Sequence, residues 1–275
     1  MLSLANANNA SGLLLACLLL IGSPAIAGEP PIVAAASDLQ FALTEAAEQF
    51  KQQTGHTLRL NFGSSGNFRR QIAQGAPFEL YLSADERYVQ ALFEEGYTQD
   101  EGVIYAIGRL VWLQRSGRDD LPSEDAPLAA VDDALTAYAN GASVRIALAN
   151  PEHAPYGVAA QQALEHAELW EPTKPLHVLG ENVSQAAQFA LSDDARGGLV
   201  AYSLALAPAL SERSEYVLIP ETWHSPLRQR MVLTNQAGEV ASAFYQWLQQ
   251  DEGQSILRRY GFATNGAGTD DVSVE

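Results

Sequence analysis

The sequence predicts an α/β fold with mostly parallel sheets. Short β-type runs alternate with segments of helical apolar spacing along almost the whole chain. With 275 residues, 47% of them hydrophobic, the chain is long enough for one large or two medium domains with a substantial core. We find no internal repeat and no Gly/Ser linker, so any boundary between domains lies inside compact structure. A barrel would need eight comparable strand–helix units, and the uneven spacing favours two lobes instead.

The first 27 residues have the pattern of a secretory signal peptide. An apolar run from Leu13 to Ile21 is followed by a small-x-small site that ends at Ala27, and the run is too short to span a bilayer. No Lys or Arg precedes the run, which is unusual for such a segment. We therefore expect cleavage after Ala27 and a periplasmic protein. A lipid anchor at Cys17, the only cysteine, is the alternative, although it would split the apolar run.

The first half of the exported chain contains clear strand and helix signals. Residues 32–36 form a β-type run, and apolar residues then recur at helical spacing until Gly55. Residues 57–62 alternate like a strand, and Gly63 begins a turn into a second helix that ends at Gly75. The remaining elements of this half are a strand at 80–82, a helix at 85–95, a long strand at 103–113 and a helix at 127–138.

The second half continues the alternation with shorter elements. The predicted strands are 144–149, 176–179, 199–202, 216–219 and 231–233. The predicted helices are 157–169, 240–248 and 254–259. The tail at 266–275 is small and polar, and we expect it to be disordered.

The charge balance excludes several classes of partner. Lys and Arg total 16 against 33 Asp and Glu, which gives a formal net charge of -17. Such a protein repels phosphodiester backbones and anionic lipid, so we expect neither nucleic-acid binding nor a basic membrane-docking surface.

The five histidines lack metal-ligand spacing, and no P-loop or Gly-x-Ser-x-Gly motif is present. We therefore expect no cofactor, no metal ligands, no catalytic residues and no enzymatic activity.

Four strand-to-helix junctions carry hydrogen-bond donors. Ser37 follows the strand at 32–36, and Ser64 and Ser65 follow the strand at 57–62. Residues 149–157 and 180–184 form two further junctions of the same kind. In open α/β sheets, ligands bind beyond the carboxyl ends of strands, where helix N-termini present free N–H groups. A single serine in such a place is more typical of a helix cap, whereas four converging junctions would form a donor-rich cage that suits an oxyanion.

Four segments, in order along the chain, resemble the periplasmic molybdate-binding proteins of ABC importers. They are Ala34-Ala35-Ala36-Ser37, Gly75-Ala76-Pro77-Phe78-Glu79-Leu80 with Ser83-Ala84, Pro151-Glu152-His153-Ala154-Pro155-Tyr156-Gly157, and Arg259-Tyr260-Gly261-Phe262. The resemblance implies a type II periplasmic-binding-protein fold, in which two α/β lobes are joined by two crossover strands around a ligand cleft. On this basis residues 30–110 plus 228–265 form lobe one, and residues 111–227 form lobe two.

The resemblance also implies the ligand and its contacts. The ligand would be molybdate, and tungstate as well, bound by a monomer and delivered to the membrane permease of an ABC transporter. Ser37 and Ser65 would supply hydroxyl and backbone donors from lobe one. Tyr156 and Val183 would supply donors from lobe two, Val183 through its N–H. Further candidate contacts are Asp38, Ser64, Asn182 and Tyr202.

The chain departs from the family pattern at several positions. The family's ligand tyrosine, found after the Gly-x-Val strand, corresponds here to Ala201; Tyr202 comes one residue late and should face the other side of that strand. We therefore expect the Tyr156 hydroxyl to replace that donor. Glu79 stands where the family usually has Asp. We expect Asp38 to point into solvent or to cap its helix, because a carboxylate would repel an anion in the cleft.

The position of Asp38 bears on which ligand is bound. Molybdate, tungstate and sulfate are fully ionised at neutral pH and offer only acceptors. Phosphate keeps a proton, so a carboxylate in the cleft would favour phosphate. Sulfate and phosphate binding remain alternatives. A less favoured one is an exported serine hydrolase, which would need a histidine within reach of Ser37 or Ser65.

Overall fold

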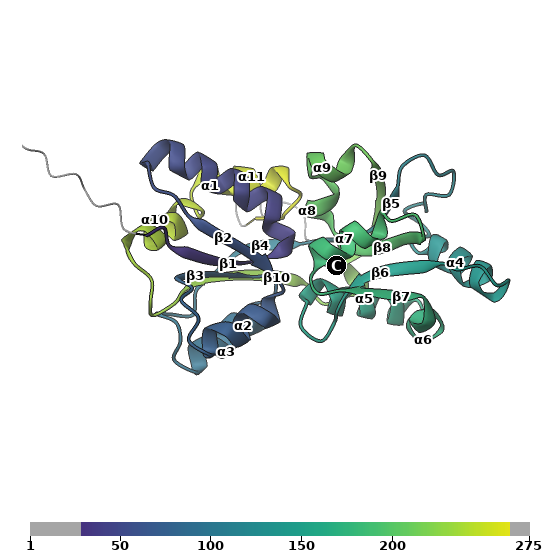
Figure 1. Ribbon diagram of the computed structural model, residues 1–275, viewed down its shortest axis with the longest axis horizontal. Helices are drawn as coiled ribbons and strands as arrows, with labels where there is room; N and C mark the ends of the chain where they lie inside the picture. Colours follow the sequence, from purple (N-terminus) through teal and green to yellow (C-terminus); the bar gives the residue numbers. More distant parts are fainter. Residues whose placement is uncertain (1–28, 265–275) are drawn as a thin grey trace, which may run out of the picture.

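The protein consists of two α/β lobes that lie side by side (Figure 1). The computed structural model describes residues 29–264. The predicted signal peptide, with Cys17, and the predicted disordered tail at 266–275 lie outside the described residues. Among the residues described, none forms a helix that is both long and apolar enough to cross a membrane.

Lobe one is built on a five-stranded sheet with the order β2-β1-β3-β10-β4. Its strands are β1 (Ile32–Ala36), β2 (Arg59–Gly63), β3 (Leu80–Ser83), β4 (Val103–Gly108) and β10 (Leu227–Leu233). Its helices are η1 (Ser37–Leu39), α1 (Gln40–Thr54), α2 (Ser65–Ala73), α3 (Glu86–Glu94), α10 (Glu239–Trp247) and α11 (Asp251–Arg259). The central strand β1 is almost entirely buried, which explains why its sequence is a continuous apolar run without alternation.

Lobe two is built on a second five-stranded sheet with the order β7-β6-β8-β5-β9. Its strands are β5 (Leu110–Arg115), β6 (Arg145–Ala149), β7 (His177–Gly180), β8 (Ala195–Ala201) and β9 (Ser214–Leu218). Its helices are α4 (Ala129–Ala139), α5 (Pro155–His166), α6 (Trp170–Thr173), η2 (Lys174–Leu176), α7 (Val183–Ala190), α8 (Tyr202–Ala205) and α9 (Pro208–Ser211). Its core includes Trp112, which is fully buried.

Two connections join the lobes. The predicted long strand at 103–113 is in fact two strands, β4 and β5, which separate at Arg109 and belong to different sheets. The chain returns from β9 to β10 through η3 (Glu221–Trp223). These are the two crossover segments that the type II fold requires.

The prediction of mostly parallel sheets is wrong for the strands next to the crossovers. β10 pairs antiparallel with β3 and β4, and β5 pairs antiparallel with β8 and β9. β1 and β6 pair in parallel with both of their neighbours. Parallel neighbours need a covering crossover connection, whereas β5 and β10 enter their sheets directly from the other lobe and can run in the opposite direction.

Candidate functional site

The four predicted junctions meet at one small cavity between the lobes. Its empty volume is about 180 Å³. It is lined by Ala36, Ser37, Asp38, Gly63, Ser64, Ser65, Ala84, Ala154, Pro155, Tyr156 and Val183. The structure therefore brings together the four principal candidates, Ser37, Ser65, Tyr156 and Val183, from strand ends that are distant in sequence.

Helix N-termini from both lobes surround this cavity. α2 begins at Ser65, α5 at Pro155 and α7 at Val183. The first N–H groups of a helix have no partner within it, and the helix dipole places partial positive charge there. None of the described residues that line the cavity is a lysine, an arginine or a histidine. The site therefore attracts negative charge through backbone dipoles instead of through cations.

Two serine hydroxyls in the cavity wall are oriented by backbone groups. The Ser65 hydroxyl oxygen accepts a hydrogen bond from the N–H of Ala84 at 3.0 Å. The Ser37 oxygen accepts one from the N–H of Ser184 at 3.2 Å. Because each oxygen already accepts a hydrogen bond, its own proton is available to be donated. This arrangement suits a ligand that offers only acceptors.

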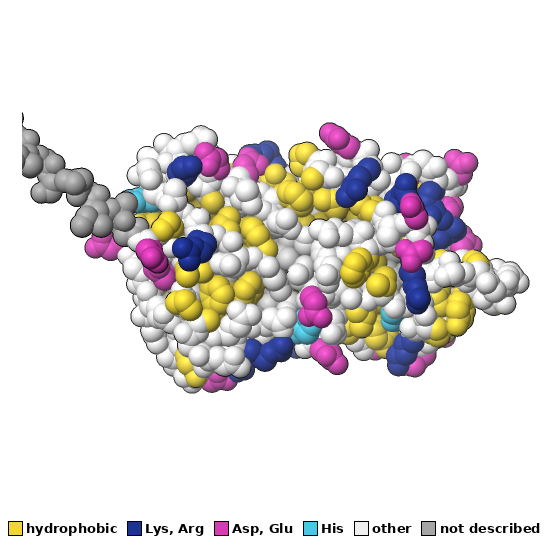
Figure 2. Space-filling model, in the orientation of Figure 1, with side chains coloured by type: hydrophobic (Ala, Val, Ile, Leu, Met, Phe, Trp, Pro, Cys, Tyr) yellow, Lys and Arg dark blue, Asp and Glu magenta, His cyan; other side chains and the backbone are white. Residues whose placement is uncertain are grey.

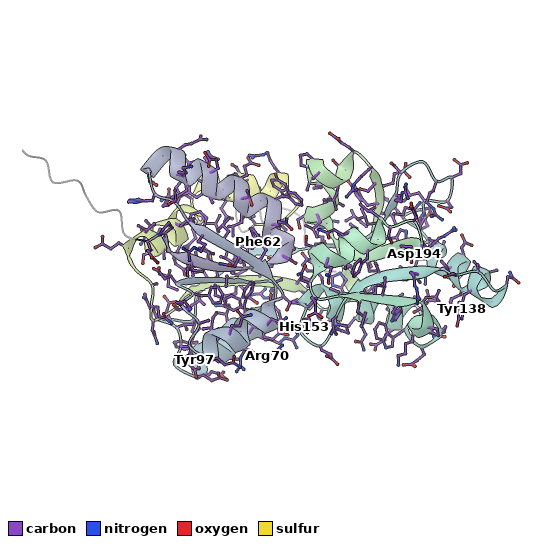
Figure 3. The ribbon with its side chains drawn as sticks, in the orientation of Figure 1. Phe62, Arg70, Tyr97, Tyr138, His153 and Asp194 are labelled. Atoms are coloured by element: carbon purple, nitrogen blue, oxygen red, sulfur yellow. The ribbon has the colours of Figure 1, made fainter. Side chains whose placement is uncertain are left out.

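A direct contact across the cleft holds the two lobes together beside the cavity. The backbone N–H of Gly66 in lobe one donates to the carbonyl of His153 in lobe two at 2.9 Å. The imidazole Nδ1 of His153 lies 3.0 Å from the hydroxyl of Ser64. Figure 3 shows His153 where the two lobes meet. The structure is thus closed over the cavity, and Ser64 is engaged by His153.

The expectation that Asp38 points into solvent or caps its helix is wrong. Asp38 is only 1% exposed, it lines the cavity, and neither η1 nor α1 has a side-chain cap. Its Oδ2 accepts a hydrogen bond from Nε2 of Gln229 at 2.5 Å, and its Oδ1 has no hydrogen-bond partner among the described residues. Burial raises the pKa of the Asp38 carboxyl to about 6, against the opposing hydrogen bonds from Gln229 and Tyr156. The carboxyl lies here because β10 places Gln229 directly against it.

Tyr156 lines the cavity, but its hydroxyl is already hydrogen-bonded to Gln229. Nε2 of Gln229 donates to this hydroxyl at 3.3 Å. Burial and the neighbouring Asp38 carboxylate raise the pKa of the Tyr156 hydroxyl well above its usual value. Tyr156 is also the second residue of α5, where its N–H has no intrahelical partner. The geometry favours this N–H over the hydroxyl as the donor to a ligand.

Two of the further candidates are not brought to the cavity. The Asn182 side chain caps α7 by accepting a hydrogen bond from the N–H of Gln185 at 3.0 Å. The sequence predicts that Tyr202 points away from the cavity because it would be the next residue of a strand. That reason is wrong, because strand β8 ends at Ala201 and Tyr202 is the first residue of α8. Its hydroxyl lies 3.3 Å from that of Tyr216.

Sequence reasoning missed Gln229 and Tyr105. The hydroxyl of Tyr105 donates to Oε1 of Gln229 at 2.6 Å, and both side chains are buried. A signal was present in the sequence, because Gln229 alternates with Leu227 and Met231, which face the core. A polar residue at an inward position of a strand indicates a buried hydrogen-bonded network.

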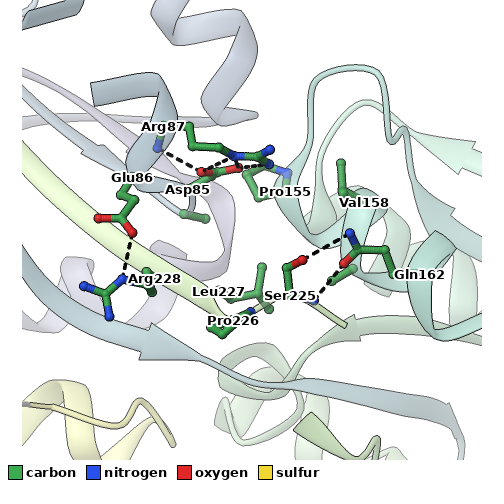
Figure 4. Close-up of a pocket in the computed structure, with 12 residues that line it drawn as sticks. Asp85, Glu86, Arg87, Pro155, Val158, Gln162, Ser225, Pro226, Leu227 and Arg228 are labelled. Atoms are coloured by element: carbon green, nitrogen blue, oxygen red, sulfur yellow. Dashed lines mark hydrogen bonds and ion pairs between the residues drawn. The ribbon is translucent and has the colours of Figure 1, made fainter. Parts of the chain in front are cut away.

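A larger pocket, with an empty volume of about 700 Å³, lies between α3, α5 and β10 (Figure 4). Its arginines are already paired: Arg87 bonds Asp85, and Arg228 bonds Glu86 at 2.7 Å.

Figure 2 shows charged side chains of both signs spread over the visible exterior. Within the described residues, no group of three or more His, Cys, Asp or Glu is placed to hold a metal ion.

Comparison with known proteins agrees with this architecture. Residues 32–263 match the family described as bacterial extracellular solute-binding protein. The chain is 35% identical to the molybdate-binding protein ModA of Rhodobacter capsulatus, over 91% of this chain and 94% of that protein. It is 32% identical to ModA of Azotobacter vinelandii, over 84% of this chain and 88% of that protein.

A solved structure extends the comparison to the fold. The periplasmic molybdate-binding protein of Azotobacter vinelandii superposes with a TM-score of 0.75 at 28% identity, over 85% of this chain and 98% of that one. The sulfate-binding protein SubI of Mycobacterium tuberculosis, at 14% identity and a TM-score of 0.67, shares the fold. The chain therefore belongs to the bacterial extracellular solute-binding proteins, within the family of the molybdate-binding proteins ModA.

Proposed function

We propose that this protein captures molybdate, and also tungstate, between its lobes and delivers it to the membrane permease of an ABC importer. The two lobes would close on the oxyanion by a hinge motion, and no chemical step would follow. Ser37 and Ser65 would donate from their hydroxyl groups, and Tyr156 and Val183 from their backbone N–H groups.

One observation carries this proposal. Backbone N–H groups and serine hydroxyls from both lobes line a single buried cavity that has no cationic side chain among its described residues. Fully ionised tetrahedral oxyanions offer only acceptors, so these donors are complementary to them. The relatives that are named molybdate-binding proteins support molybdate as the oxyanion.

Isothermal titration calorimetry of the ligand-free exported protein tests the proposal. Molybdate, tungstate, sulfate and phosphate are titrated separately under the same conditions. A single tight site for molybdate and tungstate, with much weaker or no binding of the other two, is the expected result. Heat from sulfate or phosphate alone would support an oxyanion-binding protein but would show that molybdate is not its ligand.

Phosphate is the second candidate, and the buried Asp38 favours it. A carboxylate in the wall of the cavity can accept the proton that phosphate carries at neutral pH. The same carboxylate, if ionised, would repel molybdate. The phosphate arm of the titration distinguishes the two candidates.

The hydrolase alternative finds little support in the geometry. The hydroxyl oxygens of Ser37 and Ser65 accept hydrogen bonds from backbone N–H groups, and the histidine in contact with this region, His153, bonds Ser64 instead. Hydrolysis of a p-nitrophenyl ester, measured beside a Ser64→Ala variant, tests whether Ser64 acts as a nucleophile. The expected rate is the same for both proteins.

We further propose that residues 1–27 direct export and that the mature protein acts in the periplasm as a monomer. Mass spectrometry of protein purified from a periplasmic fraction would give the mature N-terminus. A start at Gly28 supports cleavage after Ala27. A diacylated N-terminal Cys17 would support the lipid anchor instead.

A further inference from the structure

The wall of the cavity contains a carboxyl group whose hydrogen bonding is incomplete. Asp38 is 1% exposed, and its Oδ1 has no hydrogen-bond partner in the part of the chain that the structure describes, whereas Oδ2 accepts from Gln229. A buried carboxylate without full hydrogen bonding is costly, and a dianion in the same cavity would add charge repulsion. A proton on Oδ1 removes both costs.

Within residues 29–264, no positively charged side chain faces the Asp38 carboxyl. The titratable groups that face it are the hydroxyls of Tyr105 on β4 and Tyr156 on α5. Helix α7, which packs against η1, has no titratable side chain. The titratable groups on the other neighbouring elements are paired with other side chains or exposed. On α1, Glu48 pairs with Lys51 and Glu45 with Arg259; on β10, Arg228 and Arg230 both pair with Glu86. Tyr202 on α8 contacts Tyr216, and Arg59 lies at the exposed start of β2.

Groups from both lobes contribute to this burial. Gln229 and Tyr105 belong to lobe one, whereas Tyr156 covers the carboxyl from lobe two. The hydroxyl of Ser203, also in lobe two, donates to the backbone carbonyl of Asp38 at 2.7 Å. Separation of the lobes would withdraw α5 and α8 and return water to the carboxyl group. Even without a ligand, burial in the closed form raises the pKa of Asp38 to about 6.

We propose that Asp38 determines the specificity of the site by entering the closed, ligand-bound form as a neutral carboxylic acid. The inference rests on the proposed oxyanion-binding function. In the open form the carboxylate is ionised at neutral pH; on closure one proton from solvent binds to Oδ1, and the oxyanion enters as a dianion. One proton is thus taken up with each molybdate, and no covalent bond to the ligand forms.

This protonation would help to separate similar oxyanions. A neutral carboxyl group adds a donor to a cage of donors, and a more basic oxyanion accepts such a hydrogen bond more strongly. Molybdate is a stronger base than sulfate, so it gains more from Asp38. Monohydrogen phosphate brings its own proton and would bind to the ionised carboxylate without net proton uptake.

Calorimetric proton counting tests the inference. Molybdate is titrated at pH 7.5 in two buffers of different ionisation enthalpy, which gives the number of protons taken up. We expect about one proton per molybdate, with affinity that falls about tenfold per pH unit between pH 7 and 8.5. Asp38→Asn should take up no proton, bind with pH-independent affinity, and bind at least about tenfold more tightly than the wild type at pH 8.5. Asp132→Asn, at an exposed position on α4, is the matched control and should retain the wild-type pH dependence.

The outcomes separate this inference from the proposed function. Tight molybdate binding by the wild type, without proton uptake and without pH dependence, would overturn the role of Asp38 and leave the proposed function intact. Phosphate binding without proton uptake, and no molybdate binding, would overturn both. If Asp38→Asn does not fold, as judged by circular dichroism, the proton count of the wild type decides alone.

Discussion

Replacement of Gly66 by alanine should weaken ligand binding without destabilising the ligand-free protein. A Cβ at this position would lie 2.8 Å from the carbonyl oxygen of His153 and 3.0 Å from its Cα. Both are backbone atoms of the opposite lobe, and Gly66 also donates its N–H to that carbonyl. The conflict therefore exists only when the lobes are closed.

The size of the effect follows from these contacts. Overpacking against backbone costs about 1–3 kcal/mol, and a weakened hydrogen bond adds about 1 kcal/mol. Together they correspond to a loss of roughly 30-fold to 1000-fold in affinity, at tenfold for every 1.4 kcal/mol. In the open form the substitution removes a glycine from the first turn of α2, which favours the helix slightly.

Two measurements distinguish this explanation from general damage. Calorimetric titration with molybdate gives the affinity, and thermal unfolding without ligand gives the stability. We expect weaker binding together with an unchanged or slightly raised Tm. Asn67→Ala, one residue further along the helix, is the control, because its side chain bonds Arg70 of the same lobe. A Gly66→Ala affinity within about threefold of wild type would refute the reasoning, since 1 kcal/mol already exceeds that factor.

Three further predictions concern the cavity, the hydrogen bond between Tyr105 and Gln229, and a half-buried histidine. A Ser37→Ala, Ser65→Ala double variant should lose detectable molybdate binding by calorimetry, because both hydroxyl donors are removed; binding within tenfold of wild type would contradict their role. Tyr105→Phe should lower the free energy of unfolding in urea by about 1–3 kcal/mol, because it leaves the buried Oε1 of Gln229 without its donor; a change below about 0.5 kcal/mol would show that the bond contributes little. Burial lowers the pKa of His177 from 6.5 to about 4, so its neutral form is favoured in the folded state. The stability that the neutral imidazole contributes is complete above pH 6.5 and is lost as the pH falls towards 4. The free energy of unfolding in urea should therefore fall less between pH 7 and pH 5 for His177→Gln than for the wild type, and an equal fall in both proteins would contradict this.

The positions of the candidate donors could be predicted from the sequence because their signals are local. A β-type run, a serine or a Pro-x-Gly segment, and then helical periodicity together define a strand-to-helix junction at Ser37, Ser65 and Tyr156. The carboxyl ends of neighbouring parallel strands share one edge of a sheet. Convergence of these junctions was therefore a reasonable expectation, and the cavity brings these residues together.

The alternation of strands and helices also determined the fold class, but it did not determine strand direction near the crossovers. Residues 103–113 are apolar apart from Gly108 and Arg109, and this interruption alone does not identify Arg109 as the point where the chain passes from one sheet to the other. The direction of β10 depends on the strands with which it pairs, and their paired residues lie at least 119 positions earlier in the chain (Leu227 with Gly108). Pairing between distant segments is a tertiary property.

The surroundings of individual side chains were decided by the tertiary structure alone. Asp38 follows a serine at the end of a strand, where local rules predict exposure or capping. Its burial results from Gln229 of β10, which lies in the same lobe, and from Tyr156 of the other lobe, both of which are distant from Asp38 in sequence. By itself the sequence determined where the strands end and the donors begin, because those signals lie within a few residues. Only the tertiary structure decided which groups those donors and carboxylates face, because burial and charge depend on all the elements that pack around them.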